Sequence, residues 1–188
     1  MLKTKSVLHL IFLWFFSMQL VSCSTTNSIK PEESNIKLNE IINNPQSMTK
    51  SLKKLNNNFS VNILYSGVES SYYKRLVALK LESTTVIIAS SSTKLDNSTF
   101  VDILSRSKGN SIGLQLFSPT SKIKRLPDMA IKHIQTQQIN SRTLATYLIS
   151  IGYKPSQEII SRTSTFYYKN ESMILCEYIL PSLNQFLK

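Results

Sequence analysis

Residues 161–181, SRTSTFYYKNESMILCEYILP, decide the fold, because they have the pattern of two β-strands joined by a short polar turn. In an extended chain, successive side chains point to opposite faces. Glu177 then shares a face with Met173, Leu175 and Ile179, and the opposite face of the same strand is also apolar. A carboxylate between two apolar faces is costly to bury without a partner. Glu177 is therefore expected to have a specific role in the fold.

A second charged side chain lies on an apolar strand face. Residues 72–81, YYKRLVALKL, alternate so that Arg75 shares a face with Val77 and Leu79. Three explanations are open for Arg75 and Glu177. The first is a buried salt bridge between the two, the second is extension of each side chain to solvent at a strand end, and the third is a polar pocket that both line and that holds an anionic ligand. The alternation itself predicts that both are buried, with Arg75 as the counterpart of Glu177.

The remaining sequence predicts strands in runs, with helices between and after them. Apolar spacing and capping residues indicate helices, and runs of β-branched and aromatic residues indicate strands. The predicted helices are 47–55, 97–105 and 141–151, and the predicted strands are 59–65, 72–81, 85–90, 130–136, 159–169 and 173–180. The glycine-containing segment 109–113 is expected to be a loop that leads into 114–117. This order predicts an α+β fold with a single, mostly antiparallel sheet.

The first 22 residues have the pattern of an export signal. A basic start precedes an apolar run at 7–16 that is too short for a permanent membrane span, and the sequence Leu-Val-Ser-Cys follows at 20–23. This pattern resembles the lipobox of bacterial lipoproteins and predicts lipidation of Cys23; an ordinary signal peptide or an uncleaved anchor is the alternative. The expected location is the bacterial cell envelope, lipid-anchored to a membrane, with Ser24 consistent with the outer membrane. If residues 1–22 are not an export signal, the expected location is the cytoplasm.

This interpretation divides the chain into three parts. Residues 1–22 are the signal peptide, 23–46 are a flexible tether, and 47–188 are one folded domain. The tether is rich in Ser, Asn, Glu and Lys and has no sustained apolar period, apart from a short helical pattern around 38–42. The third part is long enough to bury a sizeable core by itself.

Charge and composition narrow the range of partners and cofactors that the chain is expected to have. The chain has 22 Lys and Arg against 11 Asp and Glu, a net charge of +11, and loss of the signal removes two lysines and leaves +9. Such an excess suits nucleic acid, an anionic membrane or a small anionic ligand, but the basic residues are scattered, so no nucleic-acid partner is expected. Cys176 is expected in the core. His133 cannot form a zinc site alone and no Gly-rich phosphate loop is present, so neither metal nor cofactor is expected.

Four segments together resemble the chorismate pyruvate-lyase family. Three of them are RLVALKLESTTVIIASS from Arg75, GNSIGLQLF at 109–117 and Ser-Met-Thr-Lys at 47–50. The fourth is the closing hairpin, which contains Ser-Arg-Thr-Ser from 161 and Cys-Glu-Tyr-Ile-Leu-Pro from 176. The resemblance covers residues 47–181. It implies a single antiparallel sheet covered by helices on one side, with a buried ligand cavity beneath flap-like segments.

The resemblance also implies a reaction, the elimination of pyruvate from chorismate to give 4-hydroxybenzoate, a step of ubiquinone biosynthesis, without metal or organic cofactor. Arg75 would bind a carboxylate, and Glu177 would lie beside the enolpyruvyl ether that breaks. The backbone N–H groups of Met48 and Ile112 would hold the ligand, and Arg162 would supply a second contact. A carboxyl group in an apolar pocket has a raised pKa, which suits proton transfer.

Three departures from the family leave other functions open. The span between Phe117 and Arg162 is longer than in the compact enterobacterial type, and Arg162 is followed by Thr163 where a double Arg is common. Chorismate is made in the cytoplasm, whereas a lipoprotein is exported. The alternatives are a non-catalytic lipoprotein that binds a small aromatic or cyclohexadienyl carboxylate in the same cavity, and a structural envelope lipoprotein without a ligand. The oligomeric state is not predicted.

Overall fold

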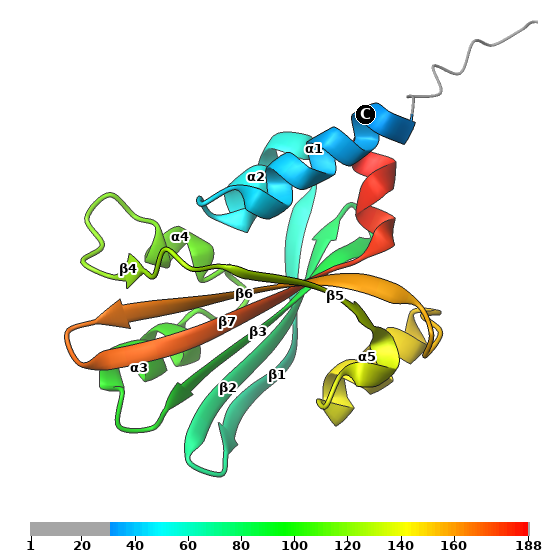
Figure 1. Cartoon of the computed structure of the whole chain (residues 1–188). Coiled ribbons are helices and arrows are strands. Elements are labelled where there is room, and N and C mark those ends of the chain that lie inside the picture. The colour runs from blue at the N-terminus through cyan, green and yellow to red at the C-terminus, as the bar shows by residue number, and fades with distance from the viewer. Residues whose placement is uncertain (1–30, 188) are drawn as a thin grey trace, which may run out of the picture.

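The computed structural model describes residues 31–187, so the predicted signal peptide, Cys23 and the tether up to residue 30 lie outside it. One seven-stranded antiparallel sheet forms the centre, in the order β1-β2-β3-β7-β6-β4, and β5 also pairs with β6 (Figure 1). The strands are β1 (Phe59–Glu69), β2 (Tyr72–Leu81), β3 (Thr84–Lys94), β4 (Lys124–Arg125), β5 (Ala130–Gln135), β6 (Glu158–Tyr168) and β7 (Glu171–Ile179). The predicted α+β fold with a single antiparallel sheet is confirmed.

Helices occupy the three predicted positions, and within residues 31–187 the structure adds α1, the short helix α4 and two 3-10 helices. The α-helices are α1 (Pro31–Asn43), α2 (Met48–Leu55), α3 (Ser98–Arg106), α4 (Gly113–Leu116) and α5 (Arg142–Ser150), and the 3-10 helices are η1 (Thr136–Gln138) and η2 (Pro181–Phe186). Within residues 31–187, no helix is long and apolar enough to cross a membrane.

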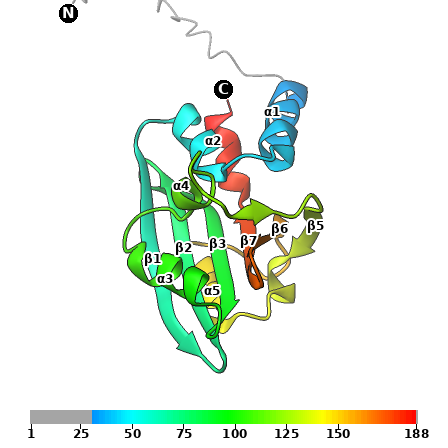
Figure 2. The same ribbon diagram turned by 90° about the vertical axis from the view of Figure 1, so that its left-hand side faces the viewer.

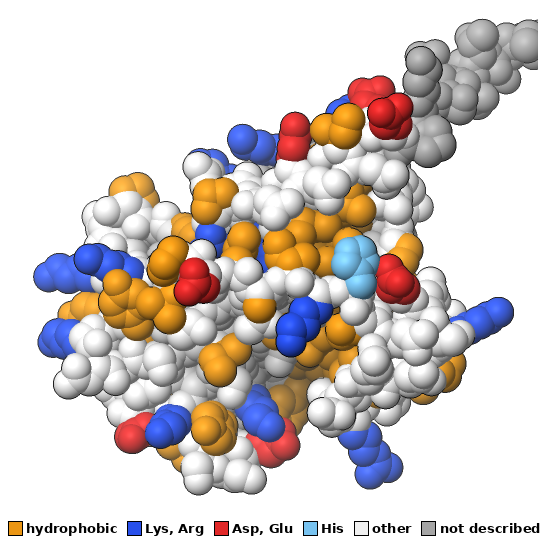
Figure 3. Space-filling view, viewed as in Figure 1, with side chains coloured by type: hydrophobic (Ala, Val, Ile, Leu, Met, Phe, Trp, Pro, Cys, Tyr) orange, Lys and Arg blue, Asp and Glu red, His pale blue; other side chains and the backbone are white. Residues whose placement is uncertain are grey.

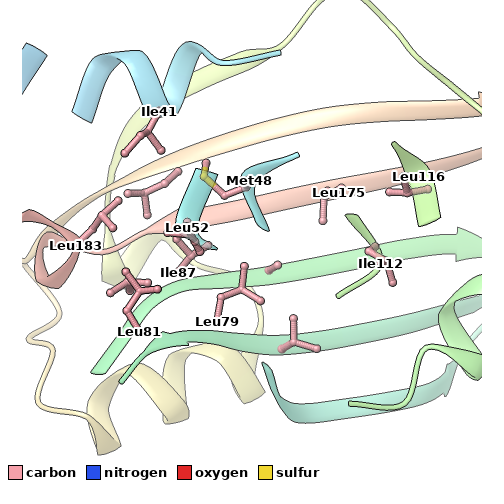
Figure 4. Close-up of a cluster of buried hydrophobic side chains, with 14 of the residues drawn as sticks. Ile41, Met48, Leu52, Leu79, Leu81, Ile87, Ile112, Leu116, Leu175 and Leu183 are labelled. Atoms are coloured by element: carbon pink, nitrogen blue, oxygen red, sulfur yellow. The ribbon is translucent and has the colours of Figure 1, made fainter. Parts of the chain in front are cut away.

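The two faces of the sheet carry separate cores, as strand alternation requires. On one face, Val77 and Leu79 of β2 pack in a cluster with side chains of α2, α3, α4 and η2. Figure 4 shows Met48 and Ile112 lying over the strands of this face. On the opposite face, Leu76 belongs to a smaller cluster with Leu144 and Leu148 of α5. Most helices therefore cover one face, and α5 covers part of the other.

Helix α1 corrects the prediction of a flexible tether for residues 31–46. It spans thirteen residues, and Ile41 and Ile42 near its end are buried. Figure 2 shows α1 beside α2, at the end of the molecule where η2 also lies. The sequence of α1 is polar because it contributes few side chains to the core, namely the partly buried Leu38 and the buried Ile41 and Ile42 near its end, and these are too few to produce a sustained apolar period.

Candidate functional site

A small cavity lies between the sheet and the α2 and α4 segments. All five residues predicted to contact a ligand line it: Met48, Arg75, Ile112, Arg162 and Glu177. Its volume is about 30 Å³, which is room for about two water molecules. The structure therefore brings the predicted residues together, in a form too closed to admit an aromatic ring without movement of the cavity wall.

Glu177 is paired with Arg162. In the β6–β7 hairpin the two residues lie directly opposite each other, and Arg162 donates from Nε at 2.8 Å and from Nη2 at 2.6 Å to Oε2 of Glu177. Both side chains are almost fully buried. The predicted pairing of Arg75 with Glu177 is therefore wrong, because cross-strand register gives Glu177 a nearer arginine.

Arg162 also reaches the end of α1. Its Nη1 donates to the carbonyl oxygens of Ile42 and Asn44, each at 3.2 Å. Arg162 therefore uses every nitrogen of its guanidinium group, two on Glu177 and one on the α1 backbone. A side chain held by four hydrogen bonds is fixed in position, so Arg162 presents Glu177 to the cavity in one orientation.

Arg75 is buried without a carboxylate partner among residues 31–187. It is 2% exposed, which excludes extension to solvent, and its Nη2 donates to the carbonyl oxygens of Lys108 and Asn110 at 2.6 and 2.9 Å. Its Nε is buried and has no hydrogen-bond partner in the part of the chain that the structure describes. Burial lowers the pKa of Arg75, and the charge of nearby Tyr73 partly opposes this. A buried cation with an unused donor beside a cavity is a site for an anion.

The protonation of Glu177 is set by opposing influences. Burial raises the pKa of the Glu177 carboxyl, while the charge and hydrogen bonds of Arg162, and then the charge of Arg125, lower it. Because burial is the largest of these, the direction is upward. Both hydrogen bonds from Arg162 reach Oε2, so Arg162 does not engage Oε1. The carboxyl group thus has a raised pKa and one oxygen free of Arg162, as proton transfer requires.

Arg125 is a cavity residue that the sequence prediction missed. It comes from the two-residue strand β4, beside β6, and its guanidinium lies 5.6 Å from the ring centroid of Phe117. Burial lowers the pKa of Arg125, the charge of Arg162 lowers it further, and Glu177 opposes this. The only feature of the sequence that pointed to Arg125 was a cluster of basic residues at 122–125. With three arginines and one glutamate in its lining, the cavity has an excess positive charge.

Hydroxyl groups complete the polar lining. Two of them, on Ser47 and Ser164, are buried without a hydrogen-bond partner within residues 31–187, and both line the cavity. With Nε of Arg75, they are three unpaired polar atoms around one small space. Buried polar groups are almost always paired, so their gathering here marks a place where a polar ligand or water supplies the missing partners.

The α2 and α4 segments meet at the cavity wall. Met48 is the first residue of α2 and Ile112 directly precedes α4, so both have backbone N–H groups near helix starts, where donors have no partner in the helix. The hydroxyls of Thr49 and Ser111 form a buried hydrogen bond between the segments. Because Thr49 and Ser111 belong to these two segments, the segments cannot separate unless this contact opens.

Gly113→Ala is expected to force the wall apart. A Cβ atom at Gly113 would lie 2.5 Å from Oγ of Ser47 and 3.1 Å from Oγ1 of Thr49. Alanine favours a helix by about 1 kcal/mol over glycine, but overpacking in a closed site costs about 1–3 kcal/mol. We expect a net loss of unfolding free energy in urea titrations.

Gly109→Ala is the matched control, because nothing lies within 4 Å of a Cβ atom there. Adding Ser47→Ala removes the nearest clashing atom, which has no hydrogen-bond partner in the described part of the chain, and should restore much of the stability. Equal stability of the Gly113→Ala and Gly109→Ala proteins would contradict the proposed contact.

The other residues considered from the sequence lie elsewhere. Cys176 is half-buried on the opposite sheet face, where the hydroxyl of Thr163 donates to its Sγ at 3.4 Å. His133 forms an exposed pair with Glu158 at 2.7 Å, beside an apolar area that Figure 3 shows next to the histidine. Across residues 31–187, no three His, Cys, Asp or Glu side chains are grouped to hold a metal ion.

Comparison with known proteins supports the fold alone. No protein-family model and no curated protein matches the sequence. Among solved structures, the gene product SA0254 from Staphylococcus aureus has a TM-score of 0.51 at 12% identity, over 72% of this chain and 89% of that chain. The ligand-binding domain of a proposed GntR-family transcriptional regulator from Bordetella bronchiseptica has a TM-score of 0.44 at 12% identity, over 66% of this chain and 87% of that one. The chain is thus similar in fold to the Staphylococcus aureus protein.

Proposed function

We propose that the chain binds a small anionic aromatic or cyclohexadienyl acid in the cavity and eliminates pyruvate from chorismate to give 4-hydroxybenzoate. The observation that carries the proposal is Arg75, a buried guanidinium that lines the same cavity as Glu177 and whose Nε has no hydrogen-bond partner within residues 31–187. The cavity's excess positive charge suits an acid. The sequence resemblance supplies the reaction.

In this proposal Arg75 holds the carboxylate of the ring. The ether C–O bond breaks with its electron pair leaving on the enolpyruvyl oxygen, and the ring loses a proton and becomes aromatic. Glu177, with its raised pKa, lies beside the ether and transfers the proton that the leaving enolpyruvate needs to become pyruvate. Aromatisation drives the reaction, so positioning and one proton-transferring carboxyl group are sufficient.

One observation favours the alternative, a non-catalytic binding protein. Two hydrogen bonds from Arg162 hold Oε2 of Glu177, and an ion pair this close favours the carboxylate over the acid form. Glu177 would then orient a ligand without giving up a proton.

The test incubates the purified full chain with chorismate and measures 4-hydroxybenzoate by chromatography and pyruvate by a coupled assay. The enzyme proposal expects both products, with turnover lost in Glu177→Gln while 4-hydroxybenzoate binding persists. Saturable binding without turnover would support the binding protein. If neither turnover nor binding is observed, both the enzyme proposal and the binding-protein alternative are contradicted.

We also propose that Cys23 is lipidated and that the chain is anchored in the bacterial envelope. The support is the sequence pattern alone. Labelled palmitate should be incorporated into the wild-type chain and not into Cys23→Ala; equal labelling of the two would contradict the proposal.

A further inference from the structure

A groove runs along the outside of the cavity wall, between α2 and α4. Its volume is about 450 Å³, and Ser47 and Gly113 line both the groove and the cavity. The groove has Lys50, Lys53 and Lys54 of α2 on its border, and an apolar lining that includes Leu114, Phe117 and Pro119. Nothing in the proposed reaction uses this surface.

The lining of the groove contains three lysines and no acidic residue, and the nearby Glu82 accepts a hydrogen bond from Asn56 at the end of α2. The segments 44–68 and 107–127, which include α2 and α4, contain seven Lys and Arg residues and no Asp or Glu. Lys53 lies 5.6 Å from the ring centroid of Phe59. Lys50, Lys53 and Lys54 are exposed, and the ion pairs found within residues 31–187 involve none of them. Figure 3 shows Lys and Arg side chains gathered where β4 lies, at the end of the second segment. Within residues 31–187, the three lysines therefore form no ion pair that would hold their charged groups away from a ligand.

The groove also exposes apolar surface beside the lysines. Leu114 is 52% exposed although it lies in a four-residue helix whose neighbours Gly113 and Leu116 are buried. Lysines bordering an apolar strip match the two layers of a membrane interface, where phosphate groups lie above acyl chains. A small anion would be drawn to the lysines, but it would gain nothing from Leu114.

We propose that this groove docks on an anionic phospholipid surface, with the three lysines at the phosphates and Leu114 in the boundary between headgroups and acyl chains. The position of α1 is compatible with this. Its first residue, Pro31, is eight residues from Cys23, a span of at most about 28 Å when fully extended, and α1 lies beside α2 (Figure 2). Docking would turn the α2–α4 wall of the cavity toward the bilayer. The proposal depends neither on the acid that the cavity holds nor on turnover.

The test is flotation of the full chain with vesicles of phosphatidylcholine alone or with 30% phosphatidylglycerol. Wild-type protein should bind the phosphatidylglycerol vesicles more strongly. Replacing Lys50, Lys53 and Lys54 with Gln should weaken that binding roughly 100-fold, from about a five-fold effect for each lysine near an anionic surface.

The matched control replaces Lys94, Lys132 and Lys154, which are also exposed, with Gln. It removes the same charge elsewhere on the domain, and residues 1–30 are identical in both variants, so only the location of the charge differs. Leu114→Ser should weaken binding roughly five-fold, compared with Ile149→Ser on α5, where Ile149 is 64% exposed. Equal binding by the two lysine variants, or equal binding of wild-type protein to both vesicles, would overturn the proposal.

Discussion

Replacing Arg162 with methionine is expected to lower the free energy of unfolding by roughly 3–5 kcal/mol at pH 7, because it leaves Glu177 buried without its partner. Glu177 is only 4% exposed, so water does not replace the lost hydrogen bonds. The change also releases the carbonyl oxygens of Ile42 and Asn44. Urea unfolding measures the loss. The exposed Arg142 on α5 supplies the control, since Arg142→Met should change stability by less than about 0.5 kcal/mol.

Acid should rescue the Arg162→Met protein. Burial already raises the pKa of Glu177, and Arg162 is the strongest opposing influence, so its removal raises the pKa further. A carboxyl group whose pKa is higher in the folded state favours folding below its unfolded pKa, and that contribution is lost as the pH rises through the folded value. The deficit against wild-type protein should therefore shrink as the pH falls toward the ordinary range of a glutamate. If the loss of unfolding free energy is the same at every pH, the ionisation of Glu177 is not its cause.

The double variant Arg162→Met with Glu177→Leu separates the charge from the packing. It replaces a buried ion pair with apolar side chains, a change that is often neutral or stabilising. We expect the double variant to be more stable than Arg162→Met alone. Together with the Glu177→Leu single variant it completes a double-mutant cycle, and a double variant whose loss equals the sum of the two single losses would show that the pair is not coupled.

Replacing Arg75 with methionine is expected to affect ligand affinity more than stability. Affinity for 4-hydroxybenzoate should fall roughly 10- to 100-fold, the usual loss for a charge-assisted hydrogen bond to an ionised partner. Stability should fall less than in Arg162→Met, because the substitution frees the carbonyl oxygens of Lys108 and Asn110 but also removes a buried cation that has no carboxylate partner within residues 31–187. Isothermal titration and urea unfolding on the same preparation give both values.

The exposed Arg106, which pairs with Asp102 on α3, is the control for Arg75. Arg106→Met has the same change of side chain at a distance from the cavity lining and should leave affinity unchanged. Unaltered 4-hydroxybenzoate affinity in Arg75→Met would remove the main support for an anion site. A large loss of stability there would instead make Arg75 a structural residue.

The fold was predictable because its strands follow their hydrophobic pattern. The predicted strand at 72–81 has the bounds of β2 in the structure, and the closing hairpin and helix α5 lie where the sequence placed them. Alternation also placed Arg75 and Glu177 on faces that proved to be buried. These properties depend on local spacing, which the sequence contains directly.

The partner of Glu177 depends on hairpin register. Tyr168 pairs with Glu171 across a two-residue turn, and counting back along both strands sets Arg162 opposite Glu177. The positive φ of 53° at Lys169 is typical of such tight turns. The sequence prediction ended the first strand at 169 and began the second at 173, and this longer turn left the register undefined. Arg125 could not be predicted at all, since a two-residue strand has no periodicity.

The bonds from Arg162 to the end of α1 connect the cavity with the segment that leads toward the N-terminus. Arg162 holds both the carboxylate of Glu177 in the cavity wall and the carbonyl oxygens of Ile42 and Asn44. A single guanidinium group therefore serves two parts of the fold that lie far apart in the sequence, and a substitution of Arg162 is expected to disturb the cavity wall and the attachment of α1 together.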